Sequence, residues 1–422
     1  MLFCLFLSAV CAAAEVKTMT LRQALDLALQ QNPDLMLARL DQQKARNQIT
    51  IARDPFSPKV FAGSGAAYST GFPASVDGAA PSIFQMRTQM SLFDRSQTYQ
   101  IAQAKENLHA TEIESGRQED EIAFRVASLF LDAEEAALSQ QAAQRQAENL
   151  ARVFEIVQAR VSEGRELPIE AARADLGVKK ARYTVESLAT DLLNAESSLA
   201  LVLGLASDDR VRAAAEERPL LTTPLIEDQS IEQALANSRD LKKLESTVDA
   251  KLLEIKGYKA MRLPKVSLIA QYELFAKYYY QSYYPVFHAN SAQLGASFEI
   301  PVLMGRSSGA YISQAEADIA KARVEVTRTR ARISSDVRRA FQEMKRAESA
   351  REVARADRDL AREQVSVDLA QNEEGRLPAT ALEQARAMEN EKFLAYYDAQ
   401  HTADRARLNV LRLTGTLAAA LK

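Results

Sequence analysis

The sequence has no tryptophan, only 3 histidines and 2 cysteines, and few glycines and prolines, 14 and 12 in 422 residues. Cys4 and Cys11 lie close to the N-terminus, so no disulfide framework is expected in the rest of the chain. His109, His288 and His401 are far apart and form no metal-spaced cluster, which indicates surface or packing roles. Phosphate loops, nucleophile elbows and paired catalytic acids are also missing. We therefore expect no enzyme, cofactor or metal site.

Two further absences concern partners. Lys plus Arg number 53 against 56 Asp plus Glu, a formal net charge of −3, so no basic footprint for nucleic acid is present. Beyond the N-terminal segment, the chain has no run of about 18 or more apolar residues, the length that a transmembrane helix needs. If the protein crosses a membrane, we expect strands to do so.

The N-terminal segment predicts an export signal. Residues 2–10 are apolar and are followed by three alanines ending at Ala14, which indicates a signal peptide over residues 1–14. No Lys or Arg precedes Lys17, so a start codon further upstream is one alternative; a frayed apolar terminus is another. Lipidation at Cys11 is a third, although its preceding residues are a poor lipobox. Cleavage would leave a mature chain without thiols, which suits an oxidising periplasm.

The two halves of the chain repeat each other. Residues 21–25 (LRQAL) match 231–235 (IEQAL) at an offset of 210, and later segments match at 211. The matched segments at the larger offset are 101–104 with 312–315 and 163–165 with 374–376. This self-similarity predicts an internal tandem repeat, with a first copy over 15–220 and a second over 221–422.

A seven-residue period marks the longest segment of each copy, with charged residues between its apolar or small positions. In the first copy these positions are Ile101, Leu108, Ser115, Ile122, Leu129, Ala136, Ala143, Leu150 and Val157. In the second they are Ile312, Ile319, Val326, Ile333, Ala340, Ala347, Ala354 and Ala361. The pattern predicts long coiled-coil helices at about 95–163 and 306–373, each about 100 Å long, with return helices at about 169–203 and 379–413.

Each long helix is preceded by an insert in which the period changes from seven to two. These inserts span about 58–93 and 264–304, and residues 292–302 alternate most cleanly between apolar and polar. Such alternation is typical of barrel strands between lipid and lumen, with two strands in each insert. Four strands do not close a barrel, so several copies must contribute; two would give eight strands and three twelve, and a water-filled conduit favours three.

The loop at 277–291, which joins the second pair of strands, contains five tyrosines between positions 278 and 284. Tyrosines beside membrane strands are typical of the headgroup level. A packed surface loop is an equal alternative.

Glycine and proline mark the turn after each long helix. The turns read Glu163-Gly164-Arg165-Glu166-Leu167-Pro168 and Glu374-Gly375-Arg376-Leu377-Pro378. Glycine adopts the left-handed conformation that ends a helix, and proline begins the next one. Both turns are therefore predicted to be hairpin tips.

This order of elements, with the repeat, the strand inserts and the glycine tips, resembles the TolC-like outer-membrane factors over residues 20–415. The resemblance implies a mainly α fold with a small β part, in which long helical hairpins form an α-barrel and four strands per chain enter a trimeric transmembrane β-barrel. It also implies a homotrimer in the outer membrane of a Gram-negative-type bacterium, in contact with lipid and extended into the periplasm. The implied partners are a periplasmic adaptor and an inner-membrane pump.

The resemblance also carries over to single residues at the tips. The implied adaptor-docking residues are Gly164, Arg165, Leu167, Gly375, Arg376 and Leu377. Family members often have acidic gate residues beyond the second tip, where this chain has Ala381 and Gln384. Glu170 and Glu383 remain as possible gate residues.

The function implied is a passive exit duct for small molecules in a tripartite efflux system, driven by the pump. Type I secretion of a polypeptide is the alternative within transport. A periplasmic coiled-coil scaffold or adaptor without a pore is the alternative of another class. The alternating inserts at matching places in both copies argue against a scaffold.

Overall fold

The computed structural model describes residues 16–65, 82–206, 208–214, 226–275, 290–302, 305–374, 376–377 and 379–421. The expected signal peptide, the tyrosine-rich loop and Gly375 lie outside the described residues. The chain divides into two compact units, which we describe separately. We name them the helical unit (Met1–Ala38, Ser115–Arg239 and Thr329–Lys422) and the strand unit (Arg39–Glu114 and Asp240–Arg328).

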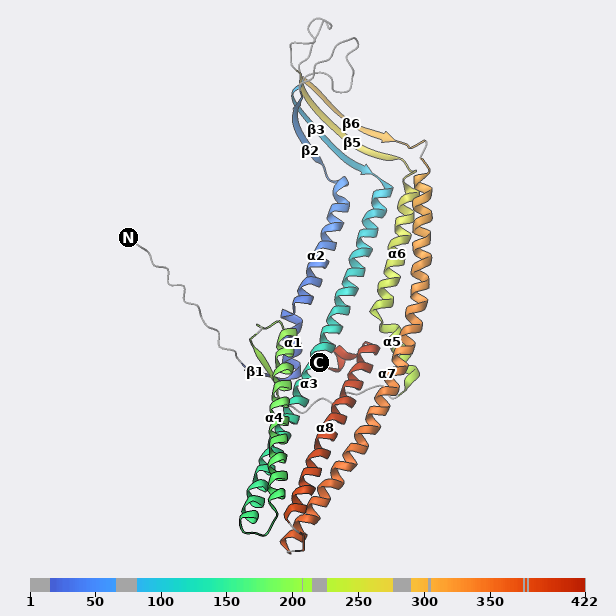
Figure 1. The fold of residues 1–422 in the computed structure, drawn as a ribbon. Coiled ribbons are helices and arrows are strands. Elements are labelled where there is room, and N and C mark those ends of the chain that lie inside the picture. Colours follow the sequence, from blue (N-terminus) through green and yellow to red (C-terminus); the bar gives the residue numbers. More distant parts are fainter. Residues whose placement is uncertain are drawn as a thin grey trace, which may run out of the picture. The chain divides into compact units, whose positions relative to one another are not determined.

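The described elements follow the predicted order twice (Figure 1). The first series is β1 (Val16–Met19), α1 (Leu21–Gln31), α2 (Pro33–Arg53), a short 3-10 turn (Asp54–Phe56), β2 (Lys59–Gly65), β3 (Ser82–Phe93), α3 (Arg95–Ser162), α4 (Pro168–Val202) and β4 (Arg210–Ala213). The second series is α5 (Glu227–Asn237), α6 (Arg239–Ala260), β5 (Lys265–Phe275), β6 (Asn290–Glu299), α7 (Ser307–Glu373), α8 (Ala379–Thr414) and α9 (Leu417–Ala420).

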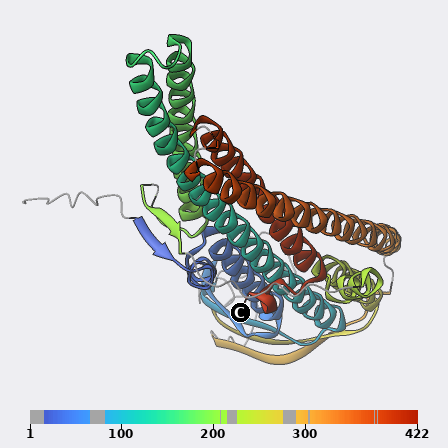
Figure 2. The same ribbon diagram turned by 90° about the horizontal axis from the view of Figure 1, so that it is seen from below.

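Within the helical unit, the helices contact one another in the order α4, α3, α8, α7. Buried residues of α3 and α4, such as Val126 and Leu199, share one apolar cluster with α1 and β4. The contact of α3 with α8 can be followed in Figure 2, and Asn390 on α8 donates to Gln146 on α3 at 2.8 Å. On α7, Phe341 packs in a cluster with α8. The hairpins α3–α4 and α7–α8 therefore adjoin through α3 and α8.

The helical unit also contains an element that the sequence did not predict. β1 pairs in parallel with β4, from Val16 opposite Arg210 to Met19 opposite Ala213. Glu196 on α4 is buried beside this pair and accepts from Arg212 Nε at 2.9 Å. Strands of four residues are too short to show a two-residue period, which is why the pattern missed them.

The strand unit holds a four-stranded antiparallel sheet in the order β2-β3-β5-β6 (Figure 1). Register and pleat put most apolar strand residues on one face and most polar ones on the other. The members of the apolar face are Val60, Ala62, Phe84, Met86, Met90, Val266, Leu268, Ala270, Tyr272, Leu274, Ala292, Leu294, Ala296 and Phe298. This arrangement agrees with the predicted alternation.

The helices of the strand unit are joined by an apolar cluster and a polar network. Ile255 on α6 packs against Ala315 and Ile319 on α7. Lys251 on α6 forms ion pairs of 3.0 Å with Asp318 on α7 and with Glu254. The hydrogen bond to Asp318, and then that to Glu254, raises the pKa of Lys251 above its ordinary value, so the amine stays charged.

The predicted helix boundaries agree with the structure to within one residue, whereas the last strand is shorter than predicted. β6 ends at Glu299 although the alternation continues through Ile300 and Val302. Pro301 lacks an N–H and restricts the residue before it, which ends the ladder. Val302, beyond the end of β6, is 89% exposed. Among the described residues, no helix is both long and apolar enough to cross a membrane.

Candidate functional site: the hairpin tips

The first tip joins α3 to α4 through a left-handed glycine. Gly164 has φ 73° and donates to Val161 O at 3.0 Å, while Arg165 N donates to Arg160 O at 2.9 Å. These two bonds satisfy carbonyls at the end of α3 in the Schellman arrangement. Pro168 then begins α4, as the sequence predicts.

The second tip repeats this backbone arrangement as far as the described residues extend. Arg376 N donates to Gln371 O at 2.8 Å, the counterpart of the bond made by Arg165. Arg165 and Arg376 each form an ion pair of 3.1 Å with the glutamate two positions earlier, and each arginine side chain is 76% exposed. The two tips thus present the same Glu and Arg pair.

The tips differ in how their side chains brace the turn. The first tip has an additional residue, Glu166, which forms an ion pair of 3.3 Å with Arg160. In the second tip, Asn372 Nδ2 donates to Leu377 O at 2.8 Å. Sequence reasoning missed both braces because each joins residues across a turn whose path is unknown beforehand.

The leucines that follow the arginines differ in exposure. Leu167 is 68% exposed, whereas Leu377 is half-buried and so less exposed. Ile169, which the sequence did not single out, is also exposed beside Leu167. An exposed leucine is ordinary by itself, but two large apolar side chains at a hairpin tip offer an anchor for a partner.

The two possible gate residues lie in the return helices just beyond the tips. Glu170 forms an ion pair with Arg173 at 2.6 Å, and Glu383 forms one with Arg386 at 2.8 Å. Each carboxylate is therefore accompanied by an arginine three positions later on its own helix. These pairs offset the acidic charge locally.

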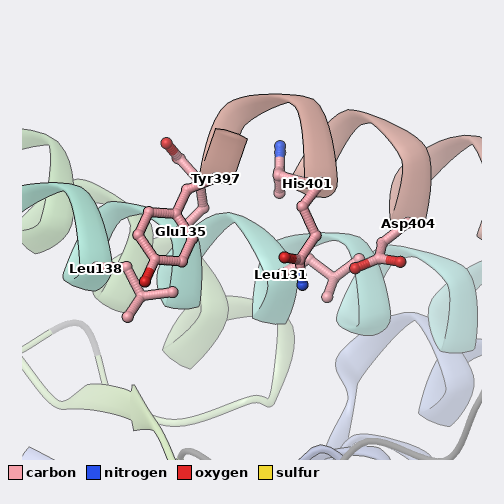
Figure 3. A pocket seen from close by; sticks show the side chains of 7 residues that line it. Leu131, Glu135, Leu138, Tyr397, His401 and Asp404 are labelled. Carbon is pink, nitrogen blue, oxygen red and sulfur yellow. The ribbon is translucent and has the colours of Figure 1, made fainter. Parts of the chain in front are cut away.

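A small cavity lies between α3 and α8, away from the tips. Figure 3 shows Tyr397, His401 and Asp404 of α8 facing side chains of α3 around it. Its volume of about 20 Å³ suits a single water molecule and not an organic substrate. His401 Nε2 lies 2.8 Å from Asp132 Oδ1, so this histidine joins two helices. Within the described ranges, no group of three or more His, Cys, Asp or Glu residues could hold a metal ion.

Comparison with known proteins gives one family. The model of the family described as outer membrane efflux protein matches residues 24–205 and 230–416, one match in each predicted repeat. No curated protein matches the chain.

Solved structures share the fold at low identity. A membrane protein from Pseudomonas aeruginosa is 19% identical, with a TM-score of 0.76, over 94% of this chain and 93% of its own. The outer membrane protein VceC from Vibrio cholerae is 16% identical, with a TM-score of 0.73, over 94% and 96%. The open state of the Neisseria gonorrhoeae MtrE outer membrane channel is 17% identical, with a TM-score of 0.71, over 94% and 89%.

Proposed function

The chain belongs to the outer membrane efflux protein family, and we propose that three copies form a passive exit duct for small molecules across the outer membrane. An inner-membrane pump supplies the energy, and a periplasmic adaptor contacts the helical tips. The observation that carries this proposal is the four-stranded sheet with one apolar face and two outer strands, β2 and β6.

The outer strands require neighbouring copies. β2 and β6 each pair on one side within the described sheet. In lipid an unpaired backbone group costs several kcal/mol, so β6 of one copy must pair with β2 of the next until the ring closes. Three copies provide twelve strands, and a barrel of twelve strands is wide enough for an aqueous lumen. A barrel of eight strands has an interior filled by side chains.

Apolar stripes on α4 and α7 support the same closure. Residues spaced by seven are exposed on each helix, namely Ile169, Leu176 and Tyr183 on α4 and Val353, Leu360 and Val367 on α7. They lie at similar distances along the chain from their own tips: Leu176 follows Gly164 by twelve residues, and Leu360 precedes Gly375 by fifteen. Because apolar residues repeated every seven positions form one row of a coiled-coil seam, α4 of one copy is expected to pack against α7 of the next.

Cysteine cross-linking tests this closure. The chain has no cysteine after Cys11, so introduced cysteines have no competing thiol once the expected signal peptide is removed. Leu176→Cys combined with Leu360→Cys should give a covalent trimer on non-reducing gels. The control combines Leu176→Cys with Arg362→Cys, which is exposed but off the stripe. Monomers alone from the first pair, or equal cross-linking by both, would contradict the proposed seam.

The tips are the proposed adaptor-docking surface: Gly164, Arg165, Leu167, Gly375, Arg376 and Leu377. The ion pairs of Arg165 and Arg376 are exposed, so exchanging each glutamate for a partner carboxylate costs little. The double change Arg165→Glu and Arg376→Glu should weaken adaptor binding about tenfold while leaving trimers intact. Arg339→Glu, which removes an exposed ion pair elsewhere on α7, serves as the control. Unchanged binding after the double change would refute the docking surface.

Glu170 and Glu383 are the proposed gate residues, supported by their positions in the return helices next to the tips. Their pairs with Arg173 and Arg386 offset the charge, so we expect only a weak cation preference there. Adaptor contacts would favour the open arrangement by binding it more tightly than the closed one.

Planar-bilayer recording is the decisive test of the duct. Purified protein in detergent should run as heat-modifiable trimers and should give stepwise conductance after insertion. A monomer that stays soluble without detergent would refute the duct. Type I secretion remains the second candidate, and transport assays with a pump of each class would distinguish the two.

A further inference from the structure

All charged side chains of the four strands lie on one face of the sheet. The strands contain five of them, and the register puts each opposite or beside polar-face residues. These are Lys59, Arg87, Lys265, Glu273 and Glu299. In the duct proposed above, on which this inference rests, that face lines the lumen because a charge in lipid is costly.

Three of the five charges are compensated near the ends of the strands that adjoin the helices. Lys59 forms an ion pair with Asp54 in the turn before β2. Lys265 lies 3.6 Å from Asp94 and stands opposite Glu299 in the ladder. The electrostatic fields of Lys59, Lys265 and Glu299 are therefore largely cancelled by these nearby opposite charges.

The other two charges, Arg87 and Glu273, lie further along the sheet on adjacent strands. Arg87 is opposite Gln271, and Glu273 is opposite Gln85, so the two charged residues are diagonal neighbours at about 7–8 Å. Glu273 Oε1 accepts from Gln85 Nε2 at 2.7 Å and also from Gln271 Nε2. Neutral amides hold this carboxylate in place without removing its charge, while the Arg87 side chain is exposed.

We propose that Arg87 and Glu273 together set the charge selectivity of the lumen for small ions. Three copies give three guanidinium and three carboxylate groups in neighbouring rows, so the wall has both signs and little net charge at this level. A twelve-stranded barrel has a backbone radius of about 12 Å, and both side chains project inward. With a Debye length of about 10 Å at 0.1 M salt, their fields reach the axis.

Reversal potentials in a KCl gradient across planar bilayers test the pair. Arg87→Gln leaves the carboxylates unopposed and should raise the K⁺ to Cl⁻ permeability ratio by about threefold at 0.1 M. Glu273→Gln should lower the ratio by a similar factor, and the double variant should return close to the wild-type value. Since the Debye length falls to about 3 Å at 1 M, both shifts should shrink at high salt.

Matched controls separate charge from structure. Arg87→Lys should keep the wild-type ratio, and Gln293→Ser, which changes a neutral residue in the same row as Arg87, should leave it unchanged. Shifts of the same sign in both single variants, or none in either, would overturn the inference while leaving the duct intact. Absence of conductance from the wild type would instead overturn the proposed function and this filter with it.

Discussion

The same backbone motif closes the hairpin tip at Gly164 and the opposite end of α4 at Gly204, but the surroundings differ. Both glycines have positive φ, 73° and 79°. In each turn the glycine N–H donates to the carbonyl three positions earlier, and the N–H of the next residue donates to the carbonyl five positions earlier. A Cβ at Gly164 would meet nothing within 4 Å, whereas one at Gly204 would lie 2.7 Å from Gln31 O. Gly415, at the end of α8, resembles Gly204, since its Cβ would lie 2.8 Å from Asn237 Cβ.

The left-handed glycine turn therefore serves two purposes in this chain. The ends of α4 and α8 are packed against the α1–α2 and α5–α6 junctions, so they fix each return helix within the helical unit. The first tip needs the turn but has open space around Gly164, which keeps this tip available to a partner. Substitutions at the packed ends should therefore affect stability, and those at the tips should affect binding.

The largest expected effect is that of Gly204→Ala. A left-handed alanine costs about 1–2 kcal/mol, and the contact with Gln31 O adds about 1–3 kcal/mol of overpacking. Thermal unfolding followed by circular dichroism should show a midpoint lowered by several degrees, and Gly415→Ala should behave alike. Gly177→Ala is the control, because this glycine lies inside α4 with nothing within 4 Å and should gain about 0.5–1 kcal/mol. A Gly204→Ala midpoint equal to that of the wild type would remove the distinction between the two ends.

The second effect concerns the asparagine that ties the α1–α2 junction to α4. Asn32 is 3% exposed; its Nδ2 donates to Val202 O at 2.7 Å and its Oδ1 accepts from Asp34 N at 2.8 Å. Asn32→Ala loses the cap and leaves a carbonyl unpaired, at about 1–3 kcal/mol. Asn32→Ser keeps a neutral cap acceptor and loses the donor to Val202 O, so its unfolding midpoint should fall between alanine and wild type. A serine variant no more stable than alanine would show that the cap is not what matters.

The long helices and the sheet strands were predictable from the sequence, whereas the contacts that join distant parts of the chain were not. Nine heptad positions and a Gly–Pro turn define α3 and its end almost without context, because each local signal agrees with the next. The strands followed from alternation, except that Pro301 cut β6 short. The β1–β4 pair joins residues about 194 positions apart, and Asn32 bonds to a carbonyl 170 positions away. No local pattern encodes such partners.

At the candidate site, too, the positions of the residues were predictable and their side-chain contacts were not. The sequence located Gly164, Arg165 and Arg376 at the tips by their repeat, and their shared geometry in the structure agrees with that symmetry. It did not reveal the braces made by Glu166 and Asn372. The repeat comparison held one signal, since Glu166 is the residue that the second tip lacks.

A third and smaller effect is expected for Gly164→Ala. With open space around the Cβ, only the left-handed conformation is penalised, at about 1–2 kcal/mol. Gly164→Asn should cost less because asparagine tolerates this region. The midpoint should move less than for Gly204→Ala, whereas adaptor binding should weaken more. A larger loss of stability at Gly164 than at Gly204 would reverse the comparison.

The smallest effect should appear between the two braces. The first tip is braced by a half-buried ion pair between Arg160 and Glu166, worth about 0–1 kcal/mol and weakened by salt, and the second by a neutral bond from Asn372 to Leu377 O. Hydrogen exchange at 0.05 and about 1 M salt should therefore show protection falling at the first tip only. Glu166→Gln should lower protection there at low salt and abolish the salt response, with the second tip unchanged. Equal salt responses at both tips would mean that neither brace governs local opening, because both turns have the main-chain bond donated by the tip arginine while their braces differ in charge.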